Sequence, residues 1–111
     1  MSNSILDELY QIILSRKGED PKVSWTARLL LEAPQLPARK LGEETTEAII
    51  AAMSGDRDAL LGESADVVYH LLVVLAAADI TLEELWGELS RRREQSGIAE
   101  KAGRDNTTSK F

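Results

Sequence analysis

The chain has 111 residues, 43% of them hydrophobic, and no cysteine. Its 19 acidic and 13 basic side chains give a formal net charge of −6, which argues against a protein that binds DNA or RNA through a broad basic surface. Without cysteine there is no disulfide framework, thiolate nucleophile or thiolate metal site, and we expect an intracellular protein. The low aromatic share and the scarcity of glycine and proline favour a single all-α domain.

No segment of the sequence resembles a targeting signal or a membrane anchor. The first seven residues lack the basic region and the apolar run of a signal peptide. The longest apolar stretch, residues 67–78, is interrupted by Tyr69 and His70 and is too short to cross a membrane. We therefore expect a soluble, cytoplasmic protein without a membrane partner.

Two helices are predicted before residue 34. Ser4 and Asp7 form a capping pattern, and apolar residues follow at helical spacing until Gly18. Ser24 predicts the N-cap of a short second helix, which should end before Pro34 because proline disfavours a helical conformation in the preceding residue. We expect a loop over residues 33–37.

Two longer helices are predicted next. The third helix should run from about Ala38 to Met53 and end at residues 54–55, where a glycine accepts the left-handed cap conformation. Asp56 is expected to cap a fourth helix that ends near Ala78.

One more helix is predicted in the C-terminal part. Thr81 and Glu84 form a capping box, and the arginines at 91–93 suit the last turn of a helix that should end at residues 96–97. We expect residues 1–104 to form the domain and the polar residues 105–111 to be a disordered tail.

The fourth predicted helix is apolar on every side. Residues 67–68 and 71–75 are all valine or leucine, so they surround the helix instead of forming one stripe. Such a helix needs neighbours on all sides, and four short helices can hardly surround it. The predicted architecture is therefore an all-α bundle of about five helices, with two central antiparallel helices, packed as a homodimer with the fourth helix at or near the interface.

The two central helices each carry a pair of carboxylates three residues apart. At about 100° per residue, Glu44 and Glu47 share one face of the third helix, and Glu63 and Asp66 share one face of the fourth. The short turn at residues 54–55 makes the helices antiparallel, and both pairs lie at similar distances from it. The pairs should therefore meet at the same height.

Four carboxylates that face one another repel unless a cation lies between them. Carboxylate oxygens suit Mg²⁺ or Mn²⁺, and a magnesium ion commonly binds substrate phosphates as well. A di-iron bundle would need Glu-x-x-His pairs, but the residue three before the only histidine, His70, is Val67. The spacing leaves two interpretations open, a site for a hard metal ion or four solvated carboxylates on exposed faces.

The acidic spacing and the residues around it resemble one enzyme family. Glu43-Glu44-x-x-Glu47 followed by Glu63-x-x-Asp66 is similar to the EExxE and ExxD signature of the all-α nucleoside triphosphate pyrophosphohydrolases, the MazG-like superfamily. Four blocks together resemble the phosphoribosyl-ATP pyrophosphatase family of histidine biosynthesis, although Trp25 and residues 31–37 depart from its pattern. The blocks are Ser24-Trp25-Thr26-Ala27-Arg28-Leu29-Leu30, Lys40-Leu41-Gly42-Glu43-Glu44-x-x-Glu47, Ala65-Asp66-x-x-Tyr69-His70-Leu71-Leu72 and Ser96-Gly97-Ile98-x-Glu100-Lys101-Ala102.

The resemblance implies a homodimeric, Mg²⁺-dependent enzyme that hydrolyses phosphoribosyl-ATP to phosphoribosyl-AMP and pyrophosphate. It implies that the metal ligands are Glu44, Glu47, Glu63 and Asp66. Glu43 is then a candidate to position or deprotonate the attacking water, beside the catalytic carboxylates Glu44 and Glu47, and is otherwise a solvent-facing helix residue.

Basic and aromatic side chains near these blocks are candidates for substrate binding. Lys40 lies on the stripe of the acidic pair of its helix and can reach a phosphate or pair with a glutamate. Trp25 can stack on a base or lie in the core. His70, one turn after Asp66, either bonds that carboxylate or is a buried histidine with its hydrogen bonds satisfied. Further cations that could contact phosphates are Arg28, Arg16, Lys17, Lys101 and Arg104.

Two other functions remain open. A related pyrophosphohydrolase that acts on a deoxynucleotide or a damaged nucleotide would share the acidic signature, so only the flanking blocks argue against it. A non-enzymatic helical interaction module would keep a solvated acidic face and would show no Mg²⁺-dependent release of pyrophosphate and no stabilisation by Mg²⁺.

Overall fold

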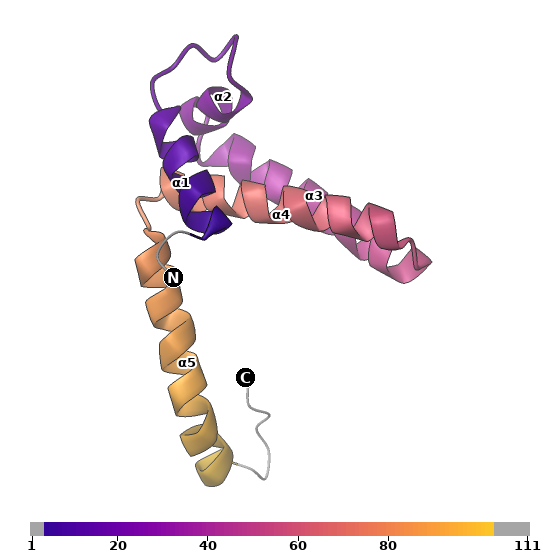
Figure 1. The fold of residues 1–111 in the computed structure, drawn as a ribbon, viewed down its shortest axis with the longest axis vertical. Helices are drawn as coiled ribbons and strands as arrows, with labels where there is room; N and C mark the ends of the chain where they lie inside the picture. The colour runs from indigo at the N-terminus through magenta and orange to yellow at the C-terminus, as the bar shows by residue number, and fades with distance from the viewer. Residues whose placement is uncertain (1–3, 104–111) are drawn as a thin grey trace. The chain divides into compact units, whose positions relative to one another are not determined.

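The computed structural model describes residues 4–103, with side chains up to residue 95, and contains five α-helices and no strand in this range. The helices are α1 (Ile5–Ser15), α2 (Trp25–Leu31), α3 (Gln35–Ser54), α4 (Arg57–Ala77) and α5 (Leu82–Gly103) (Figure 1). The all-α prediction is confirmed. Their contacts group α1 to α4 into one compact unit and place α5 in a second. The expectation of one domain stays a prediction, and the expected tail, residues 105–111, lies outside the described residues.

Side-chain caps determine where α1 and α2 begin. The Ser4 hydroxyl accepts a hydrogen bond from the Asp7 N–H at 3.2 Å, while the Asp7 carboxylate accepts one from the Ser4 N–H at 3.3 Å. The Ser24 hydroxyl accepts from the Ala27 N–H at 3.1 Å. These bonds satisfy N–H groups that have no acceptor within the first helical turn. The predicted starts of both helices are confirmed.

The start of α3 differs from the prediction. The helix begins at Gln35, so residues 35–37 of the expected loop are helical and Pro37 lies in the first turn. A proline is tolerated there because the N–H groups of the first turn have no acceptor within the helix. Pro34 occupies the N-cap position. The two prolines therefore lie at the start of α3, and the turn between α2 and α3 is limited to residues 32–34.

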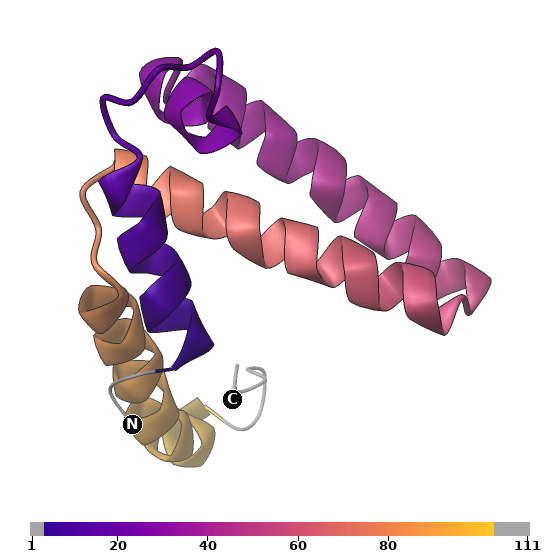
Figure 2. The ribbon, with the colours of Figure 1, turned by 45° about the horizontal axis from the view of Figure 1, so that its top comes forward.

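The two longest helices of this unit, α3 and α4, form an antiparallel hairpin (Figure 2). Gly55 ends α3 in the left-handed conformation, with φ of 75°. Asp56 then caps α4, because its carboxylate accepts a hydrogen bond from the Ala59 N–H at 3.0 Å. The predicted turn and cap are both confirmed, and they make the hairpin turn very short.

The core of this unit lies at one end of the hairpin. There α1 packs against α4, and α2 packs against both α3 and α4. The largest fully buried side chains come one from each helix, namely Ile13, Leu29, Pro37 and Val73. At its other end, next to the turn, the hairpin extends beyond α1 and α2 (Figure 2).

The extended end of the hairpin exposes large apolar side chains. Ile50 is 61% exposed, Met53 83% and Leu61 71%. Val68 and Leu71, farther along α4, are also exposed. Within this unit, α1 and α2 therefore leave part of α4 and the end of α3 uncovered.

By length and composition alone, α4 could cross a membrane, a property it shares with core helices of soluble proteins. The prediction from residues 67–78 overlooked that the helix continues toward its N-terminus as far as Arg57. The helix carries Glu63 and Asp66, whose charges are costly in a bilayer, and α3 packs against it. These features fit a core helix better than a membrane span.

The last helix, α5, begins as predicted but ends later. The Thr81 hydroxyl accepts a hydrogen bond from the Glu84 N–H at 3.1 Å. The helix continues past residues 96–97 to Gly103, because one interior glycine costs only about 1 kcal/mol and helix-favouring residues follow it. The arginines at 91–93 consequently lie inside the helix. Hydrogen bonds from Arg91 and Arg92 lower the pKa of the Glu88 carboxyl to about 2.

The conformation of Gly55 predicts a measurable difference between two glycine substitutions. Gly55→Ala should lower the free energy of unfolding by about 1 kcal/mol, because a Cβ atom destabilises the left-handed conformation. Gly62→Ala, inside α4, should raise it by up to about 1 kcal/mol. A Cβ atom would meet no other atom within 4 Å at either position, so backbone conformation alone separates the two. Urea unfolding followed by circular dichroism measures both, and changes of the same sign would contradict the prediction.

Candidate metal centre and substrate site

The middle of the hairpin brings carboxylates of α3 and α4 together. One oxygen from each of Glu44, Glu63 and Asp66 lies within 4.8 Å of the other two. Glu44 and Glu63 are half-buried, whereas Asp66 is exposed. The structure thus places three of the four predicted ligands in one cluster, at the height where the two acidic pairs were expected to meet.

The fourth predicted ligand, Glu47, adjoins this cluster through Glu63. Burial raises the pKa of the Glu63 carboxyl above its ordinary value, and the negative charges of Glu47 and Glu44 raise it further. The Oε1 atom of Glu63 is buried and has no hydrogen-bond partner. An ionised carboxylate cannot donate a hydrogen bond, so Glu44 and Glu47 cannot satisfy this oxygen while all three groups are ionised. A proton or a cation shared among the three carboxylates would satisfy it.

The donor set of the cluster fits a hard divalent cation. All three converging ligands are carboxylate oxygens, with no thiol or imidazole among them, which favours Mg²⁺ or Mn²⁺ over softer metals. The buried, unpartnered oxygen of Glu63 supports the same reading, because a cation would satisfy it and would offset the repulsion among the carboxylates.

Glu43 lies beside the cluster in sequence but pairs with cations. Its carboxylate is 3.2 Å from the Lys40 ammonium and 3.7 Å from the Arg39 guanidinium. Lys40 therefore pairs with a glutamate, one of its two predicted roles. Glu43 is therefore held by two ion pairs on its own helix and is not among the three converging carboxylates.

Trp25, at the start of α2, is 45% exposed and is therefore not a core residue. The Arg28 guanidinium lies 5.9 Å and the Lys40 ammonium 6.0 Å from the centre of its ring. Both distances are within the range of cation–π attraction. Arg28 also pairs with Glu32 at 3.0 Å. Trp25, Arg28 and Lys40 thus form an aromatic and cationic group, which we call the Trp25 group.

His70 is 6% exposed and bonds to Asp66 in an unexpected way. Its Nδ1 atom lies 2.8 Å from the backbone carbonyl oxygen of Asp66, not from the carboxylate. The alternative of a bond to the carboxylate is wrong. The expected burial of His70 is confirmed, but the ring is only partly satisfied, because Nε2 is buried without a hydrogen-bond partner. The neighbouring Tyr69 hydroxyl forms a hydrogen bond with the Thr26 hydroxyl, which ties α2 to α4.

The remaining predicted cations lie apart from the cluster or outside the described side chains. Arg16 pairs with Glu19 at 3.4 Å. Lys17 lines a cavity of about 400 Å³ between the α1–α2 connection and α2. The side chain of Lys101 and the whole of Arg104 lie outside the described part of the chain, so their predicted contacts with substrate stay predictions.

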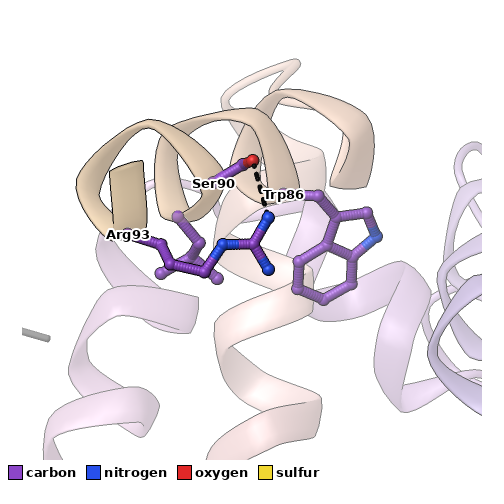
Figure 3. Close-up of a pocket in the computed structure, with 4 residues that line it drawn as sticks. Trp86, Ser90 and Arg93 are labelled. Carbon is purple, nitrogen blue, oxygen red and sulfur yellow. Dashed lines mark hydrogen bonds between the residues drawn. The ribbon is translucent and has the colours of Figure 1, made fainter. Parts of the chain in front are cut away.

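The second unit carries a hollow of its own. Trp86, Leu89, Ser90 and Arg93 line a cavity of about 400 Å³ along α5. Figure 3 shows Trp86, Ser90 and Arg93 at this hollow. The Arg93 guanidinium donates a hydrogen bond to the Ser90 hydroxyl at 3.4 Å. No carboxylate is among the described residues that line it. Arg93 was noted only as a cation near the expected helix end, and no pocket was predicted here, although the spacing of three and four places these residues on one helical face.

Two contacts near the acidic cluster were also missed. Arg39 pairs with Glu43, and the Thr26 hydroxyl bonds to that of Tyr69. The first has a clear local signal, because Arg39 and Glu43 are four residues apart on one helix. The second joins residues that are distant in the sequence, and no local pattern indicates it.

Comparison with known proteins identifies the family. The family model described as Phosphoribosyl-ATP pyrophosphohydrolase matches residues 6–93. The phosphoribosyl-ATP pyrophosphatase of Roseobacter denitrificans is 60% identical over 99 residues, which cover 89% of this chain and 94% of the relative. The same-named protein of Cereibacter sphaeroides is 57% identical over 101 residues, covering 91% of this chain and 98% of the relative. The phosphoribosyl-ATP pyrophosphatase of Ruegeria pomeroyi is 55% identical over 101 residues, which cover 91% of this chain and 96% of the relative. The chain belongs to the phosphoribosyl-ATP pyrophosphohydrolase family.

Proposed function

We propose that this protein hydrolyses phosphoribosyl-ATP to phosphoribosyl-AMP and pyrophosphate in histidine biosynthesis, and that Mg²⁺ assists the reaction. The observation that carries the proposal is the convergence of three carboxylates within 4.8 Å, in a chain whose family and relatives are named for this activity. The metal ligands are Glu44, Glu47, Glu63 and Asp66. Mn²⁺ can replace Mg²⁺ at such a site, because both prefer oxygen ligands.

The hairpin supplies the binding site for both metal and phosphates. A bound divalent cation neutralises charge on the phosphate oxygens and on the leaving pyrophosphate. The carboxylates come from two packed helices, so they need little rearrangement to bind it. A metal held in this way also explains how a protein with a net charge of −6 attracts a polyanionic substrate.

The attacking water needs a group that positions it and accepts its proton. Glu43 is the candidate for this role, at the edge of the cluster formed around Glu44 and Glu47. In the free protein it pairs with Lys40 and Arg39. A substrate phosphate that attracts Lys40 would weaken its pair with Glu43 and free that carboxylate to hold the attacking water.

The Trp25 group is suited to the other parts of the substrate. The exposed indole ring of Trp25 can stack on the purine. Arg28 and Lys40, both close to this ring, can contact phosphates. Lys40 precedes Glu44 by one turn of α3, so the group adjoins the acidic cluster. Lys101 and Arg104 complete the proposed set of substrate-binding residues.

We also propose that the protein acts in the cytoplasm without a nucleic acid or membrane partner. Its acidic charge disfavours nucleic acid, and its relatives are bacterial biosynthetic proteins. A pyrophosphohydrolase with a deoxynucleotide substrate would use the same cluster, but the names of the relatives favour phosphoribosyl-ATP. The cluster and the family both argue against a purely non-enzymatic module.

Neutralising one ligand should abolish the activity without unfolding the helices. In Glu44→Gln or Asp66→Asn an amide replaces a carboxylate, so metal affinity falls and pyrophosphate release should drop at least about 100-fold. The helical circular dichroism signal should stay unchanged, because the substitutions keep the side-chain shape. Turnover near the wild-type rate in either variant would refute the ligand assignment.

The substrate is tested by measuring Mg²⁺-dependent pyrophosphate release from phosphoribosyl-ATP beside canonical ribonucleotides and deoxynucleotides. We expect phosphoribosyl-ATP to give the highest kcat/KM, because the Trp25 group and the acidic cluster bind different parts of it. A higher kcat/KM for a deoxynucleotide would replace the proposed substrate while leaving the metal site in place.

The two tryptophans of the chain provide a matched test of the Trp25 group. Trp25→Leu should raise the KM for phosphoribosyl-ATP about tenfold, because it removes a stacking surface for the base. Trp86→Leu removes an equally large ring that is not among the proposed substrate-binding residues, and it should leave KM unchanged. Equal effects of the two substitutions would count against stacking on Trp25.

The protein is also proposed to be a homodimer that covers the extended end of the hairpin. Ile50, Met53 and Leu61 are more than half exposed there, and Val68 and Leu71 continue the exposed apolar surface along α4. A second copy would remove these side chains from water, and this burial of apolar surface favours association.

Light scattering tests the dimer. We expect twice the chain mass of 12.2 kDa at micromolar concentration, and the mass of one chain for Ile50→Glu, because a charge in the interface would be desolvated. Leu31→Glu is the matched control, since Leu31 is 71% exposed on α2, away from the hairpin turn, and should leave the dimer intact. A wild-type protein that stays monomeric would refute the proposal.

A further inference from the structure

Asp66 differs from the other carboxylates of the cluster in how its position is fixed. Its side chain is one methylene shorter than that of Glu44 or Glu63, so its oxygens follow the backbone more closely. Asp66 is exposed, and its carboxylate forms no hydrogen bond or ion pair within the described residues. The conformation of the α4 backbone at Asp66 therefore controls where this ligand lies.

His70 holds that backbone. Its Nδ1 atom is 2.8 Å from the carbonyl oxygen of Asp66. A carbonyl oxygen only accepts hydrogen bonds, so Nδ1 carries the proton and donates it. In an α-helix the same carbonyl also accepts the N–H of the residue four positions later, which is again His70. One residue thus provides two donors to the carbonyl group of the metal ligand.

The other ring nitrogen of His70 shows that burying this imidazole costs free energy. With the proton on Nδ1, the Nε2 atom is a bare acceptor, and it is buried without a hydrogen-bond partner. A leucine at this position would avoid an unsatisfied buried polar atom. The ring is also fixed by an edge contact with Tyr69, whose ring centre lies 4.8 Å away. The Tyr69 hydroxyl in turn bonds to Thr26, next to Trp25.

We infer that His70 is a positioning residue for the metal site, acting on Asp66 through its Nδ1–H bond to the Asp66 carbonyl. This inference rests on the proposed metal-binding function of the cluster. The imidazole does not touch the metal or the substrate in this role. It fixes the turn of α4 from which the shortest ligand projects, and the Tyr69–Thr26 bond connects this turn to the helix that carries Trp25.

Substitution of His70 by Asn or by Gln tests the roles of its two ring nitrogens separately. The amide nitrogen of Asn overlaps Nδ1 and can still donate to the carbonyl, whereas that of Gln overlaps Nε2 and cannot. We expect His70→Gln and His70→Leu to weaken Mg²⁺ binding about tenfold, the lower end of the range for residues that orient metal ligands. His70→Asn should retain affinity close to that of the wild type. Titration of the melting temperature with MgCl₂ alone measures the affinity without substrate.

The outcomes are distinguishable. If His70→Gln and His70→Leu bind Mg²⁺ as the wild type does, or if His70→Asn loses as much affinity as they do, the positioning role is overturned while the metal site stands. If the wild-type protein shows no shift with Mg²⁺, the proposed metal site fails and the positioning role fails with it.

A second measurement needs no substitution, which covers the case in which the variants do not fold. His70 is the only histidine of the chain, so its ring nitrogens give an unambiguous signal in ¹⁵N nuclear magnetic resonance. We expect the neutral tautomer with the proton on Nδ1, and a change in the Nδ1 signal as MgCl₂ is added. A proton on Nε2, or an Nδ1 signal that Mg²⁺ leaves unchanged, would overturn the inference.

Discussion

The site depends on the antiparallel packing of α3 against α4, which holds like charges together. Carboxylates from the two helices approach within 4.8 Å, and mutual repulsion opposes this approach. The hydrophobic contacts of α1 and α2 with the other end of the hairpin stabilise the arrangement, as do the short turn at Gly55 and the cap at Asp56. The fold thus supplies the free energy that keeps the cluster assembled before a cation binds.

This arrangement separates the stabilising part of the unit from its charged part. The largest fully buried side chains, such as Leu29 and Val73, lie where α1 and α2 cover the hairpin, while the carboxylates occupy its middle. A change in the cluster therefore removes no core packing, and loss of metal binding need not unfold the helices. The same division places Trp25 at the boundary, since α2 both packs on the hairpin and presents the exposed indole.

Local signals in the sequence predicted most of the fold. Caps at Ser4, Ser24 and Asp56 act within a few residues, so the starts of their helices were predictable. Two predicted helix boundaries were wrong, because the effect of a proline or a glycine on a helix depends on its position. A proline in the first turn of α3 and a glycine inside α5 are both compatible with a helix. In the site, periodicity predicted the meeting of the acidic pairs. It could not predict which atom of Asp66 faces His70, because both alternatives have the same spacing.

The hairpin also has room for both the proposed metal site and the proposed dimer surface. A helix pair that is covered only at one end leaves the other end exposed, and in this protein the exposed end is apolar on both helices, at Ile50 and Met53 of α3 and Leu61 of α4. The acidic cluster lies between the covered and the exposed ends. Burial of the exposed end by a second copy would exclude water from one side of the cluster and lower the local dielectric constant. Interactions between the carboxylates and a bound cation would then strengthen, and an empty cluster would be less stable for the same reason. Assembly and metal binding are therefore expected to reinforce each other through the hairpin alone, without any change in its fold.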